Sequence, residues 1–148
     1  MAYNVVPPPL PQVPETGLGI STNFNGSGIF SPNYLTSDQA ADNIKNLLLT
    51  TVGEHPHNIE FGTTLLYIIF EPNISELKQE IESIITDAVS AWIPYISIED
   101  IDIKTAEDDP NLNYNISISI TFSVNELATQ TVIINVDNQG VLDVSNGA

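Results

Sequence analysis

The chain has 148 residues and a formal net charge of −16, because 19 acidic side chains stand against only three cationic ones, Lys45, Lys78 and Lys104. An acidic chain without arginine repels phosphate groups, so we expect neither nucleic acid nor an anionic membrane surface as a partner. The chain also has no cysteine, which excludes disulfides, thiolate zinc sites and cysteine nucleophiles.

Residues 1–35 have the composition of an extended Pro/Gly-rich N-terminal arm. The prolines that favour a polyproline II conformation are Pro7, Pro8, Pro9, Pro11 and Pro14. Two PxxP spacings occur here, but no basic residue flanks them, so they are weak evidence for an SH3 ligand. The prolines interrupt any signal-peptide core, and no apolar run nears the ~20 residues of a membrane span. We therefore expect assembly in a cytoplasm, with an arm that is either disordered or ordered on a neighbour.

A single folded domain, residues 36–148, is expected after the arm, and its first half has helical patterns. Thr36 and Gln39 form a capping-box pattern, and apolar residues then recur at helical spacing. Together they predict a helix from Thr36 to about Leu49. The apolar run 63–70 is compatible with a strand or a short buried helix, and we predict a helix.

A structured loop and a long helix are predicted next. The loop runs from Gly53 to Gly62, and Phe61 is its expected buried anchor. The helix has Asn73 as a capping residue and an apolar stripe that extends to Trp92. Pro94 prevents the helix from continuing, because proline lacks the backbone N–H that a helix interior needs.

The apolar period changes to two after this helix. Isoleucines alternate at positions 96 and 98 and restart on the opposite phase at 101 and 103, so we expect a bulge near Glu99–Asp100. Strict alternation over 114–124 and again over 132–136 predicts two more strands, and a short apolar tail follows around Leu142. The order predicts an α+β fold, with about three helices packed on an antiparallel sheet of three or more strands.

Catalytic and metal-binding patterns are weak in this sequence. Two histidines, His55 and His57, lie near Glu54 and Glu60, but two-histidine spacing is unspecific evidence for zinc. With so many acids, some carboxylate pair will have a glycosidase spacing by chance, and nothing marks one acid as buried in an apolar pocket. There is no nucleophile elbow and no phosphate-binding loop. We therefore expect no enzyme, no metal and no cofactor.

Sheet edges are the remaining chemical feature. An uncovered edge strand offers unpaired N–H and C=O groups, and another chain can add a strand to it without any pocket. We expect this edge in the C-terminal strands. The residues predicted to form it are Val132, Ile134, Val136, Val141, Leu142 and Val144.

The stretch from Ile44 to Pro72 carries a family resemblance. A helix ending in Leu-Leu-Leu-Thr is followed by Gly53-Glu54, Phe61-Gly62 and Phe70-Glu71-Pro72. This pattern resembles the baseplate wedge and sheath-initiator family of contractile phage tails, to which a type VI secretion baseplate protein is similar. The resemblance covers about residues 36–136.

Two positions depart from the family pattern. The family usually carries Arg after Gly-Glu, where this chain has His55. It often carries Glu-Pro-Arg after the long helix, where this chain has Ile93, Pro94 and Tyr95. The proline is kept and both charged residues are replaced. Contacts that depend on those two charges are therefore not expected in this protein.

The resemblance implies a structural protein of the tail baseplate in the virion, present in multiple copies in a ring-shaped assembly. The implied fold is similar to the part of the sheath subunit that donates and accepts strands. The expected partners are the sheath protein, other baseplate wedge proteins and hub or tube proteins. The residues expected to bind baseplate partners are Gly53, Glu54, His55, Pro56, Phe61, Gly62, Trp92, Pro94 and Tyr95.

Two alternatives stay open at this point. Some family members are labelled lysozyme-like, so a peptidoglycan hydrolase of the tail would use acids such as Glu54, Glu60 or Glu71. The other alternative is a regulatory binding module of the same fold that acts as a cytoplasmic anti-adaptor. Adjacent sheath, tube and wedge genes would favour the baseplate over both.

Overall fold

A computed structural model of the chain describes residues 17–22, 31–69, 74–105, 108, 116–124, 129–136 and 142–146, with only the backbone for 74–75 and 142–146. The elements in chain order are β1 (Gly19–Ile20), β2 (Pro32–Asn33), α1 (Thr36–Leu49), α2 (Leu65–Ile68), α3 (Ile74–Trp92), β3 (Ile96–Lys104), β4 (Ile116–Val124), β5 (Thr129–Val136) and β6 (Leu142–Asn146). In this part of the chain, no helix combines the length and the apolarity that crossing a membrane requires.

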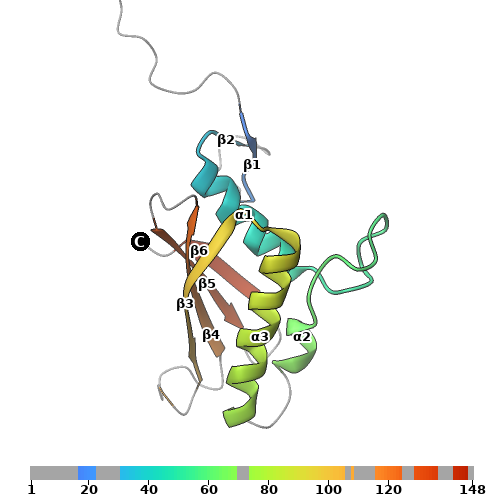
Figure 1. Ribbon diagram of the computed structural model, residues 1–148, viewed down its shortest axis with the longest axis vertical. Coiled ribbons are helices and arrows are strands. Elements are labelled where there is room, and N and C mark those ends of the chain that lie inside the picture. The colour runs from blue at the N-terminus through green and yellow to red at the C-terminus, as the bar shows by residue number, and fades with distance from the viewer. Residues whose placement is uncertain are drawn as a thin grey trace, which may run out of the picture.

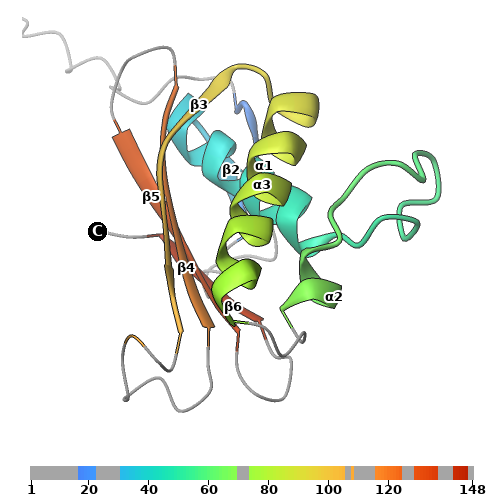
Figure 2. The same ribbon diagram turned by 60° about the horizontal axis from the view of Figure 1, so that its bottom comes forward.

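The main sheet is an antiparallel meander with the strand order β3-β4-β5-β6. Helices α1 and α3 lie side by side on one face of this sheet (Figures 1 and 2). A separate two-stranded sheet, β1-β2, lies beside the start of α1. The predicted α+β fold is confirmed.

The core lies between the helices and the sheet. Alternate residues of β4 and β5 point into it, as the period of two predicts, and their partners on α1 and α3 follow the helical stripe. The buried side chains include Ile44, Leu47, Leu48, Ile81, Ile85, Val89, Ile118, Ile120, Phe122, Val132, Ile134 and Val136. Each such side chain stabilises the fold by roughly 1.5–3 kcal/mol relative to exposure.

The predicted bulge in β3 is confirmed. The pairing register of β3 against β4 shifts between Ile98 and Asp100. Because the extra residue resets the alternation, the isoleucines on both sides of the shift face the same side of the sheet. Ile98 lies opposite Phe122, and Ile101 lies opposite Ile120. A strand without the bulge would direct half of these isoleucines to solvent.

The predicted edge at Val132, Ile134 and Val136 is wrong in its position. These residues belong to β5, which is paired with β4 on one side and with β6 on the other. Their side chains are at most 2% exposed. The apolar tail forms the extra strand β6, so the outer strands of the sheet are β3 and β6. Leu142 and Val144 do lie on an outer strand, and Val141 lies outside the described residues.

The helix predicted from Thr36 to Leu49 is confirmed, but its capping box is wrong. Leu35 occupies the capping position, and no side chain caps the helix. The Gln39 side chain instead accepts a hydrogen bond from Asn33 Nδ2 and donates one to Asn43 Oδ1. The capping box is displaced because β2 brings Asn33 within reach of Gln39.

The other predicted helices are also present. In the run 63–70, α2 is a short helix from Leu65 to Ile68, and α3 ends at Trp92 before Pro94, as predicted. The cap expected at Asn73 lies outside the described residues.

The β1-β2 sheet, with residues 17–22 and 31–33, forms an N-terminal clasp on α1. Antiparallel hydrogen bonds join its two segments, including Leu18 N to Asn33 O at 2.7 Å. Asp42 of α1 accepts hydrogen bonds from the Thr22 backbone and hydroxyl groups and from Asn33 Nδ2. A buried carboxylate thus attaches part of the predicted arm to the domain.

Lys45 of α1 is a second buried charged residue at this attachment. Its side chain is 3% exposed, and its Nζ lies 3.6 Å from Asp42 Oδ1. Within the described residues, Nζ has no hydrogen-bond acceptor, so the Asp42 charge is its compensation. Burial raises the pKa of Asp42, but the hydrogen bonds from Thr22 and Asn33 and the Lys45 charge lower it below the ordinary value of 3.8.

We predict that Asp42→Asn lowers the free energy of unfolding at neutral pH by about 3 kcal/mol, because it leaves the buried Lys45 charge uncompensated. Since the folded pKa of Asp42 is lowered, the stabilisation is complete above about pH 4 and is lost as the pH falls through the folded pKa. The difference between wild type and Asp42→Asn should therefore shrink at low pH. Urea unfolding at several pH values measures it.

Asp102→Asn is the matched control, because it breaks the exposed pair between Lys104 and Asp102 (Nζ–Oδ2 3.3 Å). That change should alter the free energy of unfolding by less than about 0.5 kcal/mol. Equal changes in the free energy of unfolding for the two variants at neutral pH would contradict a structural role for the Asp42 carboxylate.

Candidate functional site

The loop from Gly53 to Gly62 is closed by hydrogen bonds between the residues that flank it. Thr63 N donates to Thr50 O at 2.8 Å, and Val52 N donates to Thr63 O at 3.2 Å. Thr51 and Thr63 form an isolated parallel bridge. The loop projects away from the helices and the sheet (Figure 2). Compact loops with joined ends are frequent carriers of function.

Two glycines set the path of this loop, and they do so for different reasons. Gly53 has φ 95° and Gly62 has φ 118°, which are values that side chains rarely adopt. A Cβ on Gly53 would meet nothing within 4 Å, whereas a Cβ on Gly62 would lie 2.5 Å from the Thr50 carbonyl oxygen. Gly62 is therefore required both for its backbone conformation and for space.

An aromatic row leads from the loop to the end of α3. The rings of Phe61 and Trp92 are in edge-to-face contact with their centroids 5.4 Å apart, and those of His55 and Phe61 are 5.5 Å apart. Such pairs contribute about 0.5–1.5 kcal/mol beyond the area they bury. Phe61 is the anchor predicted for the loop, although it is half-buried rather than fully buried.

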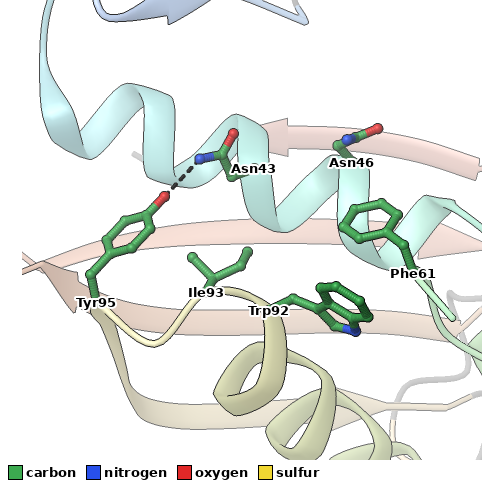
Figure 3. A pocket seen from close by; sticks show the side chains of 6 residues that line it. All are labelled: Asn43, Asn46, Phe61, Trp92, Ile93 and Tyr95. Carbon is green, nitrogen blue, oxygen red and sulfur yellow. Dashed lines mark hydrogen bonds between the residues drawn. The ribbon is translucent and has the colours of Figure 1, made fainter. Parts of the chain in front are cut away.

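A pocket of about 190 Å³ lies between α1, this row and the segment after α3 (Figure 3). The side chains that line it are Asn43, Asn46, Phe61, Trp92, Ile93 and Tyr95. Asn43 Nδ2 donates a hydrogen bond to Tyr95 Oη at 2.6 Å and closes one end. Trp92 and Tyr95 keep 36% and 43% of their surface exposed. None of the six lining side chains is charged.

The structure brings together several of the residues predicted to bind partners. Phe61 from the loop and Trp92 and Tyr95 from the helix end line one pocket. Pro94, between them in sequence, is exposed. Asn43 and Asn46 of α1 were not predicted. Their signal in the sequence is a pair of amides three residues apart, which a helix places on one face.

One carboxylate of the loop, that of Glu54, has a structural partner at the start of the loop. Glu54 Oε2 accepts a hydrogen bond from Thr51 N at 3.1 Å, which closes the first turn of the loop. Glu54 and Glu60 are exposed, and Glu71 lies outside the described residues. In the described part of the chain, no three histidine or acidic side chains gather where they could hold a metal ion.

The three lysines are all held in ion pairs with acids of the chain. Besides Lys45, Lys78 Nζ lies 2.7 Å from Asp108 Oδ2, and Lys104 pairs with Asp102. The hydrogen bond from Lys78, with further ones from Thr105, lowers the pKa of Asp108 to about 2. Because the cations are neutralised, the outward field of the protein is negative.

A family model for baseplate wedge protein gp25 matches residues 37–128, more than half of the chain. The chain belongs to the gp25 baseplate wedge family. Its place is therefore the baseplate of a phage-type tail, among other baseplate components. The resemblance seen between Ile44 and Pro72 is confirmed, and the matched segment includes all six residues that line the pocket.

A solved structure has the same fold as this gp25-family chain. It is a protein from Geobacter sulfurreducens described as a proposed tail lysozyme, with 18% sequence identity and a TM-score of 0.55. The match covers 77% of this chain and 93% of the other. No curated protein sequence matches the chain.

We predict that Gly62→Ala destabilises this gp25-family protein more than Gly53→Ala does. Both variants place a side chain at positive φ, which costs about 1 kcal/mol. Gly62→Ala should cost at least about 2 kcal/mol more, because its methyl group collides with backbone rather than with a movable side chain. Urea unfolding of the two variants measures the difference, and equal losses would contradict the steric requirement at Gly62.

Proposed function

We propose that this protein joins wedge components in the baseplate and initiates sheath assembly by pairing a β-strand with the first sheath ring. The observation that carries the proposal is the outer strand β6 in a member of a baseplate wedge family. A strand at the edge of a sheet has a row of backbone donors and acceptors that another chain can pair with. In this proposal several copies stand in a ring around the tube and offer one such edge each.

Strand β6 suits strand addition better than β3 does. The other outer strand, β3, contains the bulge between Ile98 and Asp100, which interrupts the regular row of backbone groups. It also carries Glu99, Asp100 and Asp102, against the single Asp143 of β6, and charges on an edge discourage pairing. By contrast, β6 is in continuous register with β5 from Leu142 to Asn146. The sheath strand is therefore assigned to β6.

The proposed contact with wedge neighbours lies on the opposite side of the fold from the sheet. The loop from Gly53 to Gly62 and the aromatic residues Phe61, Trp92 and Tyr95 form a surface with large, partly exposed rings. Tryptophan and tyrosine in such positions are the residue types that dominate interface energies. This surface replaces the charged Glu-Pro-Arg contact of the family with an aromatic one.

The negative field of the protein favours basic partner surfaces. With a net charge of −16 and its lysines paired, the chain attracts cationic proteins over a distance set by salt. Such steering raises association rates more than it raises final affinity. Specificity in the proposed assembly then comes from backbone pairing at β6 and from the aromatic surface.

A structural role fits the site better than hydrolysis of peptidoglycan. A retaining or inverting glycosidase needs one carboxylic acid whose pKa is raised by an apolar pocket. The pocket beside the loop is lined by uncharged side chains, and Glu54 and Glu60 are exposed outside it. The proposal therefore assigns no catalytic residue to this protein.

We predict that one of two neighbouring proline variants, Asp143→Pro and Val144→Pro, blocks sheath assembly without unfolding the domain. Successive backbone N–H groups of a strand point to opposite sides, so one variant loses a bond to β5 and the other loses an outward donor. The variant that keeps the melting temperature of the wild type is the outward one. It should fail to nucleate sheath on assembled baseplates in vitro, as seen by electron microscopy.

Removal of residues 1–14 serves as the comparison in the same assay, since it leaves β6 and the clasp in place. Normal sheath assembly with the stable proline variant would contradict the proposed pairing at β6. If sheath assembly is also normal after residues 137–148 are deleted, this chain contributes no paired strand to the sheath.

We predict that the purified protein clears no peptidoglycan in a zymogram over a range of pH. The physical reason is that no carboxylic acid lines the pocket beside the loop. The control is a known glycoside hydrolase on the same gel. Clearing that is abolished by Glu54→Gln or Glu60→Gln would establish the hydrolase instead.

A further inference from the structure

We propose that the aromatic pocket binds the proline-rich segment Pro7–Pro14 of this same protein. The pocket is the one lined by Phe61, Trp92 and Tyr95 (Figure 3). The segment reads Pro-Pro-Pro-Leu-Pro-Gln-Val-Pro and lies outside the described residues. This inference does not rest on the baseplate role: it concerns the protein before assembly, and a wedge neighbour that binds the same rings has to displace the segment.

The pocket has the ring surfaces that a polyproline II segment requires. Proline-rich peptides dock into grooves lined by aromatic side chains, which contact the flat faces of the proline rings. Here the partly exposed rings of Trp92 and Tyr95 stand on either side of Ile93, and Phe61 supports Trp92 edge-to-face. The apolar part of the pocket, with its two partly exposed rings, suits an apolar occupant.

The pocket also offers the hydrogen-bond donors that such a segment lacks. A polyproline II helix has no internal hydrogen bonds, so its carbonyl oxygens are free to accept. Tyr95 Oη accepts a hydrogen bond from Asn43, which leaves its own O–H proton to be donated. The Asn46 side chain makes no hydrogen bond within the described part of the chain and can donate its amide. Both groups border the pocket.

Charge supports the same occupant. The SH3-type reading of this segment is weak because such ligands need a basic flank. A basic flank would find no acidic partner in this pocket, since none of the six lining residues is charged. Residues 1–14 carry no charged side chain either. In a chain with a net charge of −16, an uncharged pocket and an uncharged segment are complementary.

The segment starts close enough to reach the pocket. The backbone of Gly19 in β1 packs against Gln39, since a Cβ on Gly19 would overlap that side chain. Gln39 Nε2 donates to Asn43 Oδ1 at 2.8 Å, and Asn43 lines the pocket. Pro11 and Pro14 precede Gly19 by eight and five residues, or roughly 15–25 Å at the rise of polyproline II. The same segment can also reach a neighbouring copy.

Trp92 is the single tryptophan of the chain, so intrinsic fluorescence reports directly on the pocket. We compare the full chain with a variant that carries Pro8→Ala, Pro11→Ala and Pro14→Ala. Loss of the docked segment should raise the acrylamide quenching constant of Trp92 by about twofold, because the ring becomes more exposed. Far-UV circular dichroism and thermal melting check that the folded domain is unchanged.

A synthetic peptide of residues 6–15 tests the pocket in the opposite direction. Added to the triple variant, it should restore the protected state of Trp92 with saturation, whereas the same peptide with the three alanines should not. When Tyr95→Phe is added to the triple variant, peptide binding should weaken about fivefold, because the O–H donor of Tyr95 is lost. Tyr67→Phe is the matched control, because Tyr67 is 68% exposed on α2 and outside the pocket.

Dilution of the wild-type protein over two orders of magnitude identifies the source of the segment. Protection of Trp92 that is independent of concentration means docking within one chain, and protection lost on dilution means docking from a second copy. Either result supports the proposal. Equal quenching in wild type and triple variant, together with no effect of the peptide, would overturn it and would leave the proposed sheath pairing at β6 untouched.

Discussion

The apolar face of the β3–β6 sheet must be covered, and the way α1 and α3 cover it determines where everything else lies. Because α1 packs over β4 and β5 and α3 packs beside it over β3, the end of α3 meets the middle of α1. That meeting brings Trp92, Ile93 and Tyr95 to one pocket with Asn43 and Asn46 of α1, where Asn43 is hydrogen-bonded to Tyr95. The aromatic pocket is thus a consequence of core packing, which aligns two helices distant in sequence.

A second constraint is the buried carboxylate of Asp42. Its hydrogen bonds to Thr22 and Asn33 hold the N-terminal clasp on α1, and its charge compensates Lys45 inside the domain. Buried ion pairs add little net stability, but the loss of one partner is expensive. The joint therefore specifies where the N-terminal segment is attached. It also keeps Gly19 of the clasp against Gln39, whose side chain donates a hydrogen bond to Asn43 of the pocket.

The same packing places the two surfaces proposed for assembly, strand β6 and the loop with its aromatic residues, apart from each other. The helices occupy one face of the sheet and leave β6 as an outer strand, while the loop from Gly53 to Gly62 projects on the side of the helices (Figure 2). One surface offers backbone groups and the other offers aromatic rings. In the proposed function, a subunit with two such surfaces can bind a neighbour on one side and extend a sheet on the other.

Local patterns in the sequence determined the elements of this protein. Apolar periods defined α1, α3 and the strands, the phase change at Glu99–Asp100 predicted the bulge, and the glycines of the loop carried the family pattern. These features can be predicted from the sequence because each depends on residues that are close together in it. The position of β5 inside the sheet, the use of Gln39 by Asn33 rather than by a helix cap, and the meeting of Asn43 with Tyr95 were decided only by the tertiary structure. Each of these depends on which distant segments become neighbours, and that is set by the packing of the whole core.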